Sequence, residues 1–268
     1  MTDGSPRPAP PRIEFAGWLG LRTHYLKEVR RFLKVPAQTV TGPAVTTLLF
    51  LVVFNVALGG RRPDVAGVPF VDFLAPGLLM MAMAQNAFAN TSSSLLIAKV
   101  QGTIGDLLMA PLGPTELLAG FALGGLTRGL VVGVVVTAAM LPFVPLSVAH
   151  PAFALFHAFA ANLMLALLGV LAGLWVQKMD QLGAVTSFVV TPLTFLSGTF
   201  YSVADLPERF RAAVHLNPFF YMIDGFRYGL VGHADGSPGI GVAVLTGTNV
   251  LLAVSCWRVL ASGWRLKP

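Results

Sequence analysis

The sequence predicts an all-α membrane protein, and three observations support this fold class. Of its 268 residues, 55% are hydrophobic and only 11% are charged, whereas soluble domains carry about 25% charged residues. The mean hydropathy is +0.73. The apolar residues also form continuous runs of about 20, the length that one helix needs to cross a bilayer, whereas strands of a membrane β-barrel would alternate apolar and polar residues. About six such spans leave no room for a separate soluble catalytic domain.

The first two elements lie before the apolar runs. Residues 1–12 are rich in proline and contain no apolar run, so we expect a disordered tail. Residues 13–34 predict a basic amphipathic helix. Its apolar side carries Trp18, Leu21, Tyr25, Val29 and Phe32, with Arg22 near the edge of this arc. Its opposite side carries Lys27, Arg30, Arg31 and Lys34. We expect this helix to lie on the anionic lipid surface, and docking of a partner protein is compatible with that position.

Six apolar runs then predict six transmembrane helices within a membrane domain of residues 35–268. They are residues 40–58, 72–94, 117–141, 152–176, 182–200 and 240–257. Outside the spans, Lys and Arg number twelve on one side and five on the other. Because cytoplasmic loops are the richer in Lys and Arg, both termini are predicted to be cytoplasmic. The net charge of +6 thus reflects membrane topology, and we expect the lipid bilayer, not nucleic acid, to be the partner of these charges.

Two connections between spans are expected to be helical as well. Residues 98–116, between the second and third spans, are too polar to cross the membrane and too long for a tight turn, so a short cytoplasmic helix is expected there. The longest external loop, residues 201–239, contains an apolar stretch at 219–231. This stretch of about 13 residues is too short to span a bilayer. We therefore expect a re-entrant or interfacial hairpin between the fifth and sixth spans.

Glycines at four-residue spacing mark the third and fourth spans. They are Gly120, Gly124, Gly129, Gly133, Gly169 and Gly173. Small residues at this spacing let two helices approach closely. Packing within one chain is favoured over a dedicated dimer face.

Little in the sequence indicates catalysis by this chain. There is one cysteine, Cys256, and no Cys or His cluster with metal-ligand spacing. No lysine follows a glycine and precedes Ser or Thr, so a phosphate-binding loop of the Walker type is absent from the sequence. Ser197 precedes Gly198 as in some intramembrane hydrolases, but the last span has no histidine to serve as the base. We expect no enzyme activity and no cofactor bound by this chain.

Polar residues inside the spans are the candidates for a transport path. The second span carries Asn86, Asn90 and Ser93 on one helical face, and the fifth carries Ser187, Thr191 and Thr194 in the same arrangement. Each stripe either lines a cavity or makes interhelical hydrogen bonds. Arg128 is the one clear ionisable residue near the middle of a span. It is either a functional group facing the bundle interior or a structural anchor to backbone carbonyls.

Several short motifs occur together over most of the chain. They are Phe73–Gly77 (FLAPG), Gly102–Pro111 (GTIGDLLMAP), Thr191–Tyr201 (TPLTFLSGTFY), Leu206-Pro207, Leu216–Pro218 (LNP), Tyr221 and Asp224–Arg227 (DGFR). With the preceding basic helix, this combination resembles the ABC-2 type permease family. Members are membrane subunits of bacterial ATP-driven exporters, including drug-resistance, Nod-factor and polysaccharide exporters.

The resemblance implies roles for three groups of residues. A coupling helix that contacts the ATPase subunit would include Gly102, Thr103, Ile104, Gly105, Asp106, Leu107, Leu108 and Pro111. A connecting helix beside it would include Arg22, Lys27, Glu28, Arg30 and Arg31. External re-entrant helices would include Leu206, Pro207, Asn217, Pro218, Tyr221, Asp224 and Arg227. From their own i, i+3 spacing, Asp224 and Arg227 could form an ion pair, which would either support the fold or gate substrate. Spans two and five would line the cavity.

The resemblance also implies a function. The chain would be the permease subunit of an exporter in the bacterial inner membrane, moving a lipidic, lipid-linked or amphiphilic substrate out of the cytoplasm or the inner leaflet. ATP and Mg would bind to two copies of a separate ATPase subunit, and a second permease chain, expected to be identical, would complete the complex. The alternative is an ion-coupled or channel-like transporter acting without an ATPase.

Overall fold

The computed structural model describes residues 16–58, 64, 65 and 67–264, so the expected tail at residues 1–12 lies outside the described residues. The α-helices are α1 (Ala16–Leu33), α2 (Gly42–Leu58), α3 (Phe70–Val100), α4 (Ile104–Met109), α5 (Pro114–Met140), α6 (Pro151–Trp175), α7 (Met179–Val185), α8 (Thr191–Phe195), α9 (Glu208–His215), α10 (Pro218–Val231) and α11 (Pro238–Ser262). Shorter elements are the π-helical η1 (Ala37–Thr41) and η2 (Thr186–Val190) and the 3₁₀-helical η3 (Val203–Asp205). Across these residues the structure is helical without named strands, which confirms the all-α class.

Five helices within the described ranges are long and apolar enough to cross a membrane. They correspond to five of the six expected spans, with ends shifted by a few residues. The other expected span, residues 182–200, is occupied by α7, η2 and α8, which have seven, five and five residues. Pro192 has no N–H to donate to the preceding turn, and that turn is π-helical. The helical stretch ends at Phe195, earlier than hydropathy alone predicts.

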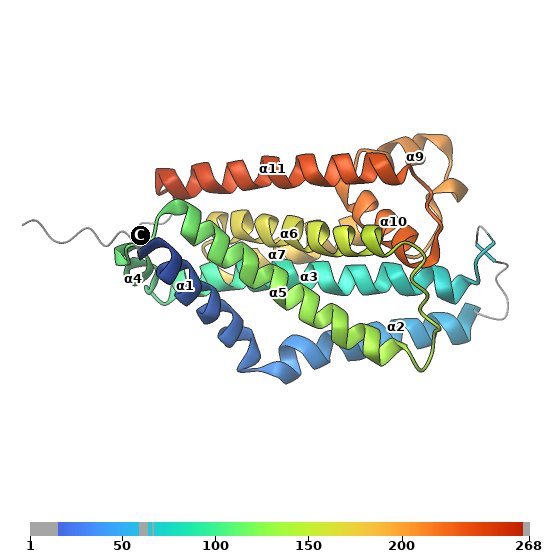
Figure 1. The fold of residues 1–268 in the computed structure, drawn as a ribbon, viewed down its shortest axis with the longest axis horizontal. Coiled ribbons are helices and arrows are strands. Elements are labelled where there is room, and N and C mark those ends of the chain that lie inside the picture. Colours follow the sequence, from blue (N-terminus) through green and yellow to red (C-terminus); the bar gives the residue numbers. More distant parts are fainter. Residues whose placement is uncertain (1–15, 59–63, 66, 265–268) are drawn as a thin grey trace, which may run out of the picture.

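The helix α3 lies in the middle of the bundle and packs against α2, α5, α6 and α10. In Figure 1, α4 and the start of α1 lie at one end of the molecule, while α9 and α10 lie at the other. Trp257 Nε1 donates a hydrogen bond to Thr115 Oγ1 at 3.2 Å. This contact places the last turns of α11 beside the first turn of α5. The first and last described helices therefore reach the same end of the bundle, the end that holds α4.

Proline and glycine mark the ends of several helices. Prolines occupy the first position of α5, α6, α10 and α11, where the missing N–H has no intrahelical partner to lose. Gly232 and Gly263 follow α10 and α11 with φ of +80° and +66°. This left-handed conformation, which glycine adopts without a Cβ clash, ends each helix.

The glycines of α5 and α6 make close helix contacts within the chain. A Cβ added to Gly124 would lie 2.6 Å from Glu28 Cβ on α1, and one added to Gly133 would lie 2.8 Å from Met83 Cε on α3. A Cβ on Gly173 of α6 would lie 2.8 Å from Leu95 Cβ of α3. The expected role of these glycines in internal packing is confirmed.

Replacing Gly125 with alanine should destabilise the bundle by about 1–3 kcal/mol, the usual cost of overpacking a core. The new Cβ would lie 2.7 Å from Thr91 Cγ2 and 2.8 Å from Ala166 Cβ, and neither neighbour is the end of a flexible chain. The measurement is the thermal unfolding midpoint in one detergent. Gly247→Ala on α11 is the matched control, because its Cβ meets no atom within 4 Å. Equal midpoints for the two variants would contradict the packing argument.

Candidate functional site

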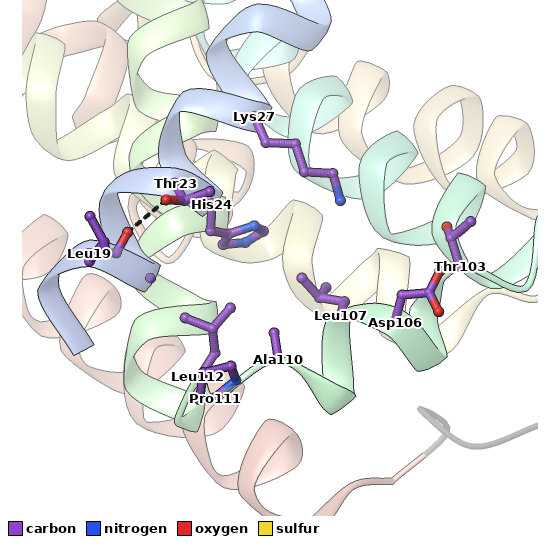
Figure 2. Close-up of a pocket in the computed structure, with 11 residues that line it drawn as sticks. Leu19, Thr23, His24, Lys27, Thr103, Asp106, Leu107, Ala110, Pro111 and Leu112 are labelled. Carbon is purple, nitrogen blue, oxygen red and sulfur yellow. Dashed lines mark hydrogen bonds between the residues drawn. The ribbon is translucent and has the colours of Figure 1, made fainter. Parts of the chain in front are cut away.

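The helices α1 and α4 face each other across a groove of about 540 Å³ (Figure 2). From α1, the lining residues are Leu19, Gly20, Thr23, His24 and Lys27. From α4 and its flanking turns, they are Thr103, Asp106, Leu107, Ala110, Pro111 and Leu112. The structure thus brings together the two segments that the sequence motifs single out as coupling and connecting helices. The groove wall is mostly apolar, with Lys27 and Asp106 among its charged members.

The helix α4 is anchored on one side and open on the other. Ile104 is buried in the core, and Leu107 is half-buried against the same core. Asp106 and Leu108 are exposed, and Met109 is 78% exposed. Gly102 has φ +74°, a conformation that lets the chain turn sharply between α3 and α4. The helix α4 is thus fixed to the core through Ile104 and Leu107, while its other side faces outward.

The helix α1 packs on the bundle through His24, Glu28 and Phe32, which include only part of its apolar arc. Arg22, Lys27 and Arg30 are exposed, as the pattern predicts. Trp18, however, is 75% exposed, whereas Glu28 is fully buried. The main partner of α1 is α5, where Gly120 and Gly124 lie against His24 and Glu28. Glu28 Oε1 also accepts a hydrogen bond of 2.8 Å from Ser94 Oγ on α3. Trp18, on the predicted apolar arc, is therefore left outside the bundle, where the expected lipid-facing side of this helix would lie.

The side chain of Arg31 completes this polar contact between α1 and α3. Its Nη2 donates to the carbonyl oxygen of Asn90 at 2.7 Å and to Asn90 Oδ1 at 2.9 Å. Its Nη1 donates to Ser93 Oγ at 3.4 Å, and its guanidinium forms an ion pair with Glu28 at 3.3 Å. Asn90 and Ser93, two of the three residues of the expected stripe on α3, therefore contact α1.

His24 lies beside the groove in the contact between α1 and α5. Its ring meets Phe121 edge-on with 4.4 Å between ring centroids. Burial lowers the pKa of His24 to about 4, and the nearby Lys27 adds to the lowering. The imidazole is therefore neutral at pH 7.

A lowered histidine pKa makes stability depend on pH in a defined direction. Between about pH 6.5 and pH 4 the unfolded chain binds a proton at His24 that the folded chain does not, so folding stability falls as pH falls through this window. We expect His24→Asn to remove this part of the slope. The measurement is the unfolding midpoint of both proteins from pH 8 to pH 4, taken as a difference so that other titrating groups cancel. Parallel curves for the two proteins would contradict the assignment.

A second cavity, of about 350 Å³, lies between α2, α3 and α8. It is lined by Pro43, Thr46, Thr47, Phe50, Met81, Ala82, Gln85, Asn86, Thr191 and Phe195, and we refer to it as the central cavity. Asn86 and Thr191 were among the expected lining residues. Thr194 is buried and receives a hydrogen bond of 3.2 Å from Gln85 Nε2, and Ser187 is exposed. The sequence reasoning missed Gln85 and the hydroxyl pair of Thr46 and Thr47, although two adjacent threonines in an apolar run are a detectable signal.

Arg128 lies near the middle of α5 and contacts a side chain of α3. Its Nη2 donates to Asn86 Oδ1 at 2.9 Å. Because Asn86 also lines the central cavity, the guanidinium is one side chain away from that space.

The expected ion pair between Asp224 and Arg227 is wrong. Arg227 is 1% exposed, donates from Nη2 to the carbonyl oxygen of Gly198 at 2.6 Å, and lies 3.7 Å from the centroid of the Phe73 ring. Asp224 instead accepts hydrogen bonds from the backbone N–H groups of Asp235 and Gly236 at 2.8 and 2.9 Å. Backbone groups are therefore the direct partners of both charges, and the two side chains hold different segments together.

The other predicted residues of this region lie at the ends of α9 and α10. Leu206 and Pro207 lead into α9. Asn217 caps α10, since its Oδ1 accepts a hydrogen bond from Phe219 N at 3.0 Å. Pro218 is the first residue of α10, and Tyr221 is buried within it. Ser197, the residue weighed as a nucleophile, accepts a hydrogen bond from Asn217 Nδ2 at 2.9 Å, so its partner is an amide and not a base.

Comparison with known proteins identifies the family. The model of the ABC-2 type transporter family matches residues 21–231. The chain is 38% identical to the inner membrane transport permease YadH of Escherichia coli K12 over 250 residues, which cover 93% of this chain and 98% of that protein. It is 26% identical to nodulation protein J of Rhizobium meliloti over 239 residues, which cover 85% and 84% of the two chains. The matched region includes α4, the central cavity and α10, so this chain belongs to the ABC-2 type transporter family of membrane permeases.

Proposed function

We propose that this chain is the permease subunit of an ATP-driven exporter that moves a lipidic, lipid-linked or amphiphilic substrate out of the cytoplasm or the inner leaflet. Families of this type normally work with an ABC ATPase. In the proposal, two ATPase subunits hold ATP and Mg, and two permease chains form the path between them. This chain contributes binding and movement, not hydrolysis.

The proposal includes a six-span topology in the inner membrane. The five long apolar helices and the stretch from α7 to α8 would cross the bilayer, with both termini and α4 in the cytoplasm. The helices α9 and α10 would lie at the external side as the re-entrant segment. Their position at the opposite end of the bundle from α4 supports this orientation (Figure 1).

The observation that carries the proposal is the construction of α4. It presents Asp106, Leu108 and Met109 outward while Ile104 fixes it to the core. In the proposed mechanism, closure of the ATPase dimer pushes α4. The push passes through α3 to the central cavity and changes the side of the membrane to which that cavity opens.

The test is purification of the tagged chain from its native membrane in mild detergent, with mass spectrometry of the proteins that accompany it. We expect a roughly equimolar ATPase that carries a phosphate-binding loop. Reconstitution of this complex should give ATP-dependent movement of a fluorescent lipid between leaflets. Repeated purification of the chain alone, including after crosslinking, would count against the proposal and favour a transporter that works without an ATPase.

A further inference from the structure

The guanidinium of Arg128 lacks a counter-charge within the described part of the chain. The ion pairs found there join Arg31 to Glu28 and His233 to Asp235. Arg128 has its hydrogen bond to Asn86 Oδ1, and its Nε is buried without a hydrogen-bond partner. Arg128 is half-buried, and a charge inside a membrane span is costly unless it is paired, so Arg128 is a candidate functional group.

The nearest polar cluster does not supply the missing negative charge. Glu28 is already engaged by Arg31 and by Ser94, so the Glu28–Arg31 pair is neutral as a unit. Asn90, the residue that Arg31 contacts, also has a buried Nδ2 without a hydrogen-bond partner. Arg128 therefore keeps one excess positive charge, whereas the buried Nδ2 of Asn90 is not part of the cavity lining.

The central cavity gives an anion a place to bind. Its lining residues include hydroxyl and amide groups but no charged side chain, and Phe50, Met81 and Phe195 supply apolar wall for a hydrocarbon chain. Asn86 lies on this wall and also accepts the hydrogen bond from Arg128. Arg128 is not itself a lining residue, so a head group would reach its guanidinium by displacing the Asn86 oxygen. The planar guanidinium fork matches the geometry of phosphate and carboxylate groups.

We propose that the central cavity takes an amphiphile with an anionic phosphate or carboxylate head group, and that Arg128 holds its negative charge. This inference rests on the proposed export function and specifies its substrate class. The apolar wall holds the chain of the amphiphile, while Thr46, Thr47 and Gln85 supply further hydrogen bonds near the head group.

The test measures lipid binding to the purified chain in detergent by native mass spectrometry. The probes are dioleoyl phosphatidylglycerol and dioleoyl phosphatidylcholine, which share acyl chains and differ in net charge. We expect the wild-type chain to prefer the anionic lipid by at least about tenfold. Arg128→Gln, which keeps a donor toward Asn86, should bring the ratio of the two affinities within about twofold. Arg30→Gln is the matched control, since it removes the same charge from the exposed side of α1 and should keep the preference.

A second variant keeps the test decisive if Arg128→Gln does not fold. Asn86→Asp places a carboxylate beside the retained arginine, so it should abolish the preference for anionic lipid while leaving Arg128 in place. Retention of the preference in both variants would overturn the proposal. Displacement of the bound lipid by inorganic phosphate alone would also overturn it, because the ligand would then be a free anion. The binding assay contains no ATPase, so its failure and failure of ATPase recovery are separate outcomes.

Discussion

Replacing Asp106 with lysine should weaken association of the chain with its ATPase subunit at least about tenfold, which corresponds to about 1.4 kcal/mol. Asp106 is exposed on the open side of α4, and the change reverses a charge at the proposed contact without touching the buried Ile104. If the ATPase surface that meets Asp106 is positive, a lysine there places two like charges together, which is strongly unfavourable at an interface. The measurement is the amount of ATPase recovered with the tagged permease, followed by the rate of ATP-dependent lipid movement.

The matched control for Asp106→Lys is Glu208→Lys. Glu208 is also exposed, but it lies in α9 at the other end of the bundle (Figure 1). This variant should keep full ATPase recovery. Leu107 is a poorer test site, because its side chain packs on the core and a bulky replacement would disturb folding as well as contact. Equal recovery with both charge reversals would remove α4 as the coupling element.

Replacing Glu28 with alanine should produce the largest loss of stability of the variants considered. It leaves Arg31 beside Asn90 without its carboxylate, and breaking a buried ion pair by removing one partner costs about 3–5 kcal/mol. The expected loss lies near the lower end of this range, since the side chain of Arg31 is 28% exposed and water compensates part of the cost. The unfolding midpoint should fall accordingly. Limited trypsin digestion should then cleave within α1, which carries Lys27, Arg30 and Arg31.

A double-mutant cycle separates the ion pair from general damage to α1. Glu28→Ala combined with Arg31→Ala should be less destabilised than the sum of the single variants, with a coupling energy of about 0.5–3 kcal/mol. Arg30→Ala is the neutral control, because Arg30 is exposed on the same helix. Additive effects of Glu28→Ala and Arg31→Ala would mean that the two residues stabilise α1 independently.

Hydropathy predicts most of this fold because the membrane itself sets the length of a crossing helix. That constraint is local, so α3, α5, α6 and α11 follow from the sequence to within a few residues at most ends. The end of the expected fifth span is different, since the break after Phe195 depends on a proline, a π turn and Gly198. The sequence also identifies α10 as a non-spanning segment, because its apolar stretch is too short to cross the bilayer.

Tertiary polar contacts account for what the sequence does not predict. Periodicity separates an apolar arc with Trp18 from a basic side with Arg31 on α1. It does not show that Arg31 and Glu28 contact Asn90 and Ser94 of α3. Spacing places Asp224 and Arg227 within reach of each other, but each side chain binds a backbone group outside α10. Asp224 accepts hydrogen bonds from the N–H groups after α10, at Asp235 and Gly236, and Arg227 donates to the carbonyl oxygen of Gly198. Of the central cavity, periodicity identifies Asn86 and Thr191. The contributions of α2 depend on how helices pack, which spacing within one helix does not specify.

The short stretch from α7 to α8 has a consequence for the bilayer around the proposed transporter. Pieces of seven, five and five residues, at about 1.5 Å per residue, give a length several ångströms below the hydrocarbon thickness of about 30 Å. In the six-span topology, such hydrophobic mismatch thins the neighbouring lipid. Thr191 and Phe195, which line the central cavity, belong to this stretch. In that topology the bilayer would be thinner along this wall of the cavity, and a polar head group that crossed there would have a shorter apolar barrier to pass.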